Sequence, residues 1–84
     1  MWYNRGLALS KLGHHAESVD SYDKALAITQ NLPGAWNNRG FALDKLGRYA
    51  EAIVSFNKVL DIDPDDEVAR NNREFARQQY NLKP

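Results

Sequence analysis

A 34-residue repeat constrains this chain more than any other feature. Asn-Arg pairs begin at Asn4, Asn38 and Asn72, so each copy follows the previous one by 34 positions. Tryptophan, glycine, alanine, leucine and lysine residues keep the same offset between the first two copies. A fixed period of this size is typical of repeat proteins, in which each unit buries its apolar face against its neighbours.

Within each copy, the apolar residues follow the spacing of a helix. Trp2, Gly6, Leu9 and Leu12 recur at intervals of three and four residues, which places them on one stripe of an amphipathic helix. Gly13 in the first copy and Gly47 in the second then supply the left-handed residue that ends many helices. A second apolar stripe follows, so each copy predicts two helices joined by a tight turn.

The chain is therefore expected to be all-α, a right-handed α-solenoid of antiparallel helical hairpins. Pro33-Gly34 and Asp63-Pro64 separate the units, and the acidic residues that follow favour the start of another helix. The expected helices span residues 2–12, 16–29, 35–46, 50–61 and 65–80. They form a single domain over residues 1–84, with repeat 1 at 1–32, repeat 2 at 33–66, and a capping helix and tail at 67–84.

The pattern resembles the tetratricopeptide repeat (TPR) family. The signature positions of the second unit are filled by Trp36, Gly40, Ala52, Phe56 and Pro64. The first unit departs from the signature, because Ser18 stands for the usual alanine and Gln30 for the usual proline. The resemblance implies a protein–protein interaction module, in which an extended peptide of a partner binds a concave groove lined by the first helix of each repeat.

Small residues explain why the two helices of a unit can pack closely. A side chain at Gly6 or Gly40 would hold the helix backbones apart. Ala16, Ala50 and Ala52 are expected to allow the same approach from the second helix.

The expected groove residues share the side of the first helices that faces away from the Trp stripe. With Trp36 at 0° on a helical wheel, Asn38 lies at about 200° and Phe41 at about 140°. The asparagine amides would pair with a peptide backbone, and apolar side chains of the peptide would dock against the groove aromatics. The groove set is Tyr3, Asn4, Leu7, Lys11, Asn37, Asn38, Phe41, Lys45, Val68, Asn71, Asn72, Phe75 and Gln79.

Three alternatives stay open at this stage. Duplication of a repeat copies its surface residues too. The row of Asn4, Asn38 and Asn72 therefore also fits a scaffold whose groove holds no ligand. Exposed repeat ends suit a self-association module that forms homodimers or larger homo-oligomers. A third reading is nucleic-acid binding through Arg5, Arg39 and Arg73, although we expect these side chains to be half-buried and paired with acids from neighbouring helices.

Composition gives no support to nucleic-acid binding or to a membrane location. Eleven basic and eleven acidic residues balance, so no net charge favours nucleic acid or an anionic membrane. The chain has no cysteine, and no apolar run approaches the roughly 18 residues of a transmembrane helix. The start, MWYNRG, lacks the charged and apolar regions of a signal peptide, so a cytoplasmic location is expected.

The sequence begins at the first Trp of a repeat, and we therefore expect it to be a piece of a longer repeat array, natural or engineered.

No enzyme, cofactor or metal site is expected either. His14-His15 is the only histidine pair, and it falls in the first turn with no third ligand at a suitable spacing. The sequence contains no Ser-His-acid set or phosphate-binding loop. The expected partner is a protein or peptide.

Overall fold

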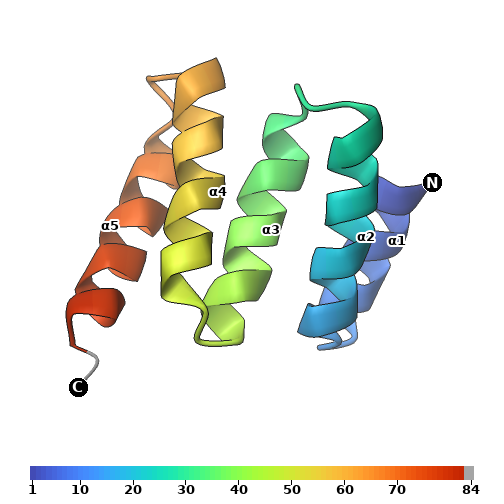
Figure 1. The fold of residues 1–84 in the computed structure, drawn as a ribbon, viewed down its shortest axis with the longest axis horizontal. Helices are drawn as coiled ribbons and strands as arrows, with labels where there is room; N and C mark the ends of the chain where they lie inside the picture. The colour runs from blue at the N-terminus through green and yellow to red at the C-terminus, as the bar shows by residue number, and fades with distance from the viewer. Residues whose placement is uncertain (83–84) are drawn as a thin grey trace.

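A computed structural model describes residues 1–82 and shows an α-helical fold, as predicted. Over these residues the chain forms five α-helices and no strand, and the helices follow one another as stacked antiparallel pairs (Figure 1). The helices are α1 (Trp2–Lys11), α2 (His15–Ile28), α3 (Pro33–Lys45), α4 (Tyr49–Ile62) and α5 (Glu67–Asn81). Each helix packs against the next one along the chain, which makes the fold a helical solenoid.

Apart from the start of α1, the helix ends differ from the predicted ones by one or two residues, for local reasons. Helix α3 begins at Pro33 rather than at residue 35, since a proline at the first helical position costs no hydrogen bond. Helix α5 begins at Glu67 because Asp66 caps it, accepting a hydrogen bond from the Ala69 N–H at 3.0 Å. The turns after α1 and α3 end in Gly13 and Gly47 with φ of 81° and 75°, as the sequence predicted.

Within each repeat, the expected close packing at glycine is confirmed. A Cβ atom on Gly6 would lie 2.6 Å from Cε1 of Tyr22, and one on Gly40 would lie 2.5 Å from Cε1 of Phe56. Both distances are far below a van der Waals contact. The aromatic ring of the second helix therefore rests directly on the backbone of the first.

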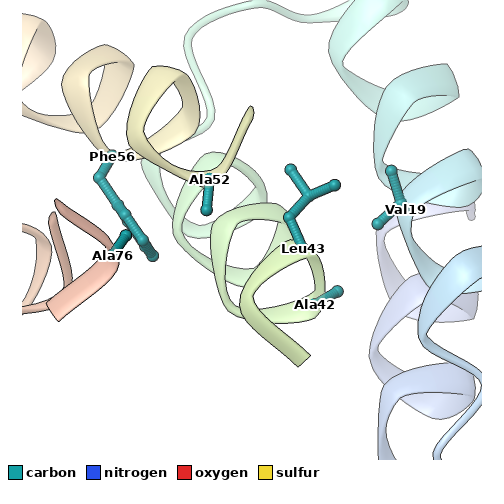
Figure 2. Packing of buried hydrophobic residues seen from close by; sticks show 6 residues of the cluster. All are labelled: Val19, Ala42, Leu43, Ala52, Phe56 and Ala76. Carbon is teal, nitrogen blue, oxygen red and sulfur yellow. The ribbon is translucent and has the colours of Figure 1, made fainter. Parts of the chain in front are cut away.

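The main core cluster joins four helices. Its buried members are Val19 of α2, Ala42 and Leu43 of α3, Ala52 and Phe56 of α4, and Ala76 of α5 (Figure 2). A second cluster surrounds Tyr22, Leu26 and Ala35, between α2 and α3. These contacts cross repeat boundaries, so the units stabilise one another.

One prediction about this core is wrong. Ala16 and Ala50 are exposed, because both lie in the first turn of a second helix and off its packed side. Only Ala52 is buried as expected. Its equivalent in the first repeat, Ser18, is also buried, and its hydroxyl donates to the Gly6 carbonyl oxygen at 2.9 Å.

The stack is curved, and its inner side is formed by the first helices. Among the described residues, α1 approaches α3 and α3 approaches α5, whereas α2 and α4 do not reach each other. A row of helices that is close on one side and open on the other curves toward the close side. We call the surface that α1, α3 and α5 share on this side the inner face.

Candidate functional site

The predicted groove residues all lie on α1, α3 or α5, and none of them is buried. Half-buried side chains belong to Tyr3, Leu7, Asn37, Asn38, Asn72 and Gln79. Exposed side chains belong to Asn4, Lys11, Phe41, Lys45, Val68, Asn71 and Phe75. The set thus combines partly enclosed amides with aromatic and basic groups that reach solvent.

The asparagines differ in how much of their hydrogen-bonding capacity is free. Asn38 donates through Nδ2 to the Tyr3 hydroxyl at 3.4 Å, a long bond that links α3 to α1 across the inner face. Asn37 has a buried Oδ1 with no hydrogen-bond partner, so that oxygen does not face solvent. Asn4 is exposed and Asn72 half-buried. The amide row is therefore not uniform, and Asn38 is the member tied into the fold.

Two aromatic side chains of the predicted groove keep a large exposed area. Phe41 is 47% exposed and Phe75, one repeat later, is 49% exposed, while Val68 is 61% exposed. The Lys45 Nζ lies 5.1 Å from the centre of the Phe41 ring, a cation–π contact that keeps a positive charge over the aromatic surface. Apolar side chains exposed in a row are typical of a binding surface.

Asp44 is an acid at α3 that the sequence analysis did not single out. Burial raises the pKa of its carboxyl group from 3.8 to about 6, and the neighbouring Lys45 charge lowers it in part. Its Oδ1 is buried and has no hydrogen-bond partner. No sequence pattern marks this position, because the burial of Asp44 depends on the packing of neighbouring helices.

The arginine row serves the fold, although only one of its partners is an acid. Arg39 donates through Nε to Asp23 of α2 at 2.6 Å and through Nη1 to Ser55 of α4 at 2.6 Å. Arg5 and Arg73 each make one of these two kinds of hydrogen bond. The Nη1 group of Arg5 donates to the Ser21 hydroxyl of the following helix, and that of Arg73 donates to the Asn57 side-chain oxygen of the preceding helix, both at 3.0 Å. The expectation of acidic partners was correct only for Arg39.

A cavity lies outside the predicted groove. It has a volume of about 530 Å³ and opens between α2 and α4, over the N-terminal half of α3. Leu26, Trp36 and Ile62 supply apolar walls, with Arg39 and Lys58 among the charged groups around them. The sequence did not predict this cavity, because its walls come from three successive helices and depend on how these pack.

The described residues hold no group of three or more His, Cys, Asp or Glu side chains suited to a metal ion. His14 instead lies 3.5 Å from the Glu17 carboxylate, three positions along the chain. No described helix has the length and apolar character needed to cross a membrane.

Comparison with known proteins identifies the repeat. A sequence profile described as tetratricopeptide repeat matches residues 33–66, and a second one, described as TPR repeat, matches residues 6–47. The TPR domain of Arabidopsis OM64 has a similar structure, with a TM-score of 0.86 and 27% sequence identity. The match covers 92% of this chain and 64% of that domain, so the chain spans less than two thirds of its length. No curated protein sequence matches. The profile matches and the stacked helical pairs show that this chain belongs to the tetratricopeptide repeat family.

Proposed function

We propose that this protein binds an extended peptide segment of a partner protein along the inner face. TPR domains are in general protein–protein interaction modules, and they act by binding rather than by catalysis. The observation that carries the proposal is the pair Phe41 and Phe75, which lie one repeat apart on the first helices α3 and α5 and are about half exposed. We further propose that repeat 1, repeat 2 and the cap divide at residues 32 and 66, and that the protein acts in the cytoplasm.

The size of the inner face sets the length of the peptide. Packed helices lie 8–10 Å apart, so three adjacent first helices offer a surface about 20–25 Å long. An extended chain advances about 3.3 Å per residue, and six to eight residues would cross that surface. The proposed ligand is therefore a short linear segment and not a folded domain.

Two kinds of contact would fix such a segment. The phenylalanines provide flat apolar surfaces for one or two anchoring side chains of the peptide, and burial of such anchors supplies most of the affinity in many interfaces. The amides of Asn4, Asn38 and Asn72 can each donate and accept, which suits the alternating N–H and C=O groups of an extended backbone. Because Asn38 already makes only a long bond of 3.4 Å to Tyr3, it can exchange that partner for a peptide group.

Two of the alternatives, self-association and nucleic-acid binding, receive less support from the geometry. Outward self-association at the C-terminal end would need an apolar surface, whereas α5 places Arg70, Glu74 and Arg77 where α3 has Trp36, Gly40 and Leu43. Nucleic-acid binding would need free guanidinium groups in a row, whereas all three arginines donate hydrogen bonds within the fold. We therefore place the binding site on the inner face.

A selection experiment tests this proposal. The immobilised protein is used to select from a displayed library of random peptides, and the affinity of the selected peptide is measured by titration calorimetry. Replacing Asn38 and Phe41 together by alanine should weaken binding at least tenfold, with an unchanged helical circular dichroism spectrum. Val54→Ala is the matched control, since Val54 is 52% exposed on α4 and outside the inner face. Equal affinity of the double variant and the control would refute the proposal.

A further inference from the structure

The cavity between α2 and α4 combines apolar walls with charged groups. Trp36 of α3, the buried Leu26 of α2 and Ile62 of α4 supply the apolar part. Its volume of about 530 Å³ lies within the range of about 300–1,000 Å³ that is usual for small-molecule sites. None of the residues that line it belongs to the predicted groove. The cavity is therefore a separate place on the fold, and its size suits a small organic ligand.

The two repeats differ in what covers the ring of the equivalent tryptophan. In the first repeat, the Nζ atom of Lys24 lies 4.4 Å from the centre of the Trp2 ring. Lys58, which stands 34 positions after Lys24, lines the cavity but makes no such contact with Trp36 among the described residues. The indole N–H of Trp36 already donates to the Gln30 carbonyl oxygen at 2.8 Å, so the ring face is the part that a ligand can use. A ligand can thus take the place over Trp36 that Lys24 takes over Trp2.

Four charged side chains line the cavity, and two of them neutralise each other. Arg39 donates to the Asp23 carboxylate at 2.6 Å. Lys58 and Asp61 are exposed and, within the described part of the chain, take part in no hydrogen bond or ion pair. They are three positions apart on α4, and at that spacing the Cβ atoms of a helix lie about 5–6 Å apart. The cavity thus offers one unpaired cation and one unpaired anion side by side.

Duplication of the repeat does not account for this pair of charges. Lys58 repeats Lys24, but Asp61 stands where the first repeat has Ala27. A cationic ligand would be attracted by Asp61 and repelled by Lys58, and an anionic ligand would meet the reverse. A zwitterion whose two charges lie close together can pair with both side chains at once. The charges around the cavity therefore favour a ligand that is neutral overall and carries one charge of each sign.

We propose that this cavity binds a free amino acid with a large apolar side chain. The α-ammonium group of the ligand donates to the Asp61 carboxylate, and its α-carboxylate accepts from the Lys58 ammonium group. The side chain of the ligand covers the Trp36 ring, between Leu26 and Ile62. Because the cavity shares no residue with the predicted groove, this proposal and that of peptide binding on the inner face succeed or fail separately.

L-Tryptophan is a suitable probe, since it combines both charges with a large apolar side chain. It is titrated into isotopically labelled protein, and the indole N–H resonances of Trp2 and Trp36 are followed by NMR. The Trp36 resonance should shift and the Trp2 resonance should not. For a ligand of about fifteen non-hydrogen atoms in an open site, we expect a dissociation constant of about 0.1–2 mM. No shift at about 10 mM tryptophan, or equal shifts of both indoles, would overturn the proposal.

Two analogues test the two charge contacts separately. Tryptamine lacks the carboxylate and N-acetyl-L-tryptophan lacks the ammonium charge, so each should bind about two- to fivefold more weakly than L-tryptophan. Lys58→Met should weaken binding of L-tryptophan but not of tryptamine, and Asp61→Asn should weaken binding of L-tryptophan but not of N-acetyl-L-tryptophan. Tryptamine or N-acetyl-L-tryptophan binding as tightly as L-tryptophan would overturn the proposal, by assigning the cavity to a simple cation or a simple anion. Equal affinity for N-acetyl-L-tryptophanamide, which resembles a residue within a chain, would assign it to a peptide side chain instead and overturn the proposal too.

A pair of isoleucine variants tests the apolar part of the cavity. Ile62→Ala should weaken binding of L-tryptophan about three- to tenfold, because the ligand loses an apolar wall. Ile28→Ala is the matched control, since Ile28 is the counterpart of Ile62 in the first repeat, is 73% exposed and does not line the cavity. Circular dichroism checks that both variants keep their helices. Equal affinity of the two variants for L-tryptophan would overturn the proposal.

Discussion

Arg39 on α3 donates its Nε–H to the Asp23 carboxylate of α2 at 2.6 Å, and this contact joins the two repeats. The same guanidinium group donates forward to the Ser55 hydroxyl of α4, which belongs to its own repeat. Because Arg39 is only 16% exposed, both bonds lie in a partly desolvated position. Arg39, which we expected to be half-buried, therefore links three helices.

The Arg39–Asp23 pair should contribute measurably to stability. A double-mutant cycle with Arg39→Ala and Asp23→Ala, followed by chemical denaturation, should give a coupling free energy of about 0.5–1 kcal/mol. The value stays modest because the Asp23 side chain is 49% exposed. A coupling indistinguishable from zero would show that the contact does not hold the repeats together.

Arg48 and Glu51 provide the matched control for that cycle. They form a pair at 2.6 Å within one helical turn, and both side chains are about half exposed, at 47% and 48%. Exposed pairs at this spacing contribute only about 0.3 kcal/mol. Their coupling should thus be smaller than that of Arg39 with Asp23.

Gly40→Ala should destabilise the protein although alanine favours helices. The new Cβ would lie 2.5 Å from Cε1 of Phe56, and relieving such overpacking costs about 1–3 kcal/mol. The higher helix propensity of alanine offsets at most about 1 kcal/mol of this cost. Urea denaturation should therefore show a lower midpoint, and Phe56→Leu should cost less in the Gly40→Ala background than in the wild type.

Gly34→Ala is the control that separates overpacking against Phe56 from the change in helix propensity. Its Cβ would approach the Tyr3 hydroxyl at 2.7 Å, but that atom is the end of a flexible side chain that can move. We expect a change in unfolding free energy within about 0.5 kcal/mol, as for ordinary surface substitutions. A loss as large as that of Gly40→Ala would show that the Phe56 ring is not the cause.

Asp44 should make stability depend on pH. Burial raises its pKa to about 6 in the folded protein, above the 3.8 of an ordinary aspartate. The folded state then holds the proton more tightly, so this group favours folding fully below pH 3.8 and loses that contribution as pH rises through 6. Asp44→Asn should stabilise the protein at pH 7.5 by about 1 kcal/mol, a value reduced for the solvent that reaches this half-buried group, and by almost nothing at pH 4.

Denaturation of both proteins at the two pH values measures this difference directly. Comparing the variant with the wild type at each pH removes the contribution of the other titrating groups. A stability gain that is the same at pH 4 and pH 7.5 would exclude Asp44 as the source of the pH dependence.

The sequence predicted those features that depend on a repeated local pattern. Gly13 and Gly47 end their helices as expected, and the close contact at Gly40 follows from a glycine facing an aromatic residue one helix later. The exposure of Ala16 was missed, because helical spacing alone does not fix how far a packed stripe extends into the first turn.

Features that several helices form together could not be predicted from the sequence. Asp44 lies one position from the exposed Lys45, and periodicity cannot show that its oxygen loses water and finds no donor. The pairing of Arg39 with Asp23 and of Arg73 with Asn57 likewise depends on how adjacent helices pack. Only the three-dimensional packing gives these contacts.

An NMR titration with the library-selected peptide tests the central claim most directly. Amide and methyl shifts of the labelled protein are recorded as the peptide is added, and the affected residues are mapped onto the structure. Binding on the inner face predicts the largest changes at Asn38, Phe41 and Phe75, with little change at Val54 on α4. Changes centred instead on the cavity between α2 and α4, around Trp36, would contradict the account and move the peptide site to the opposite side of the stack.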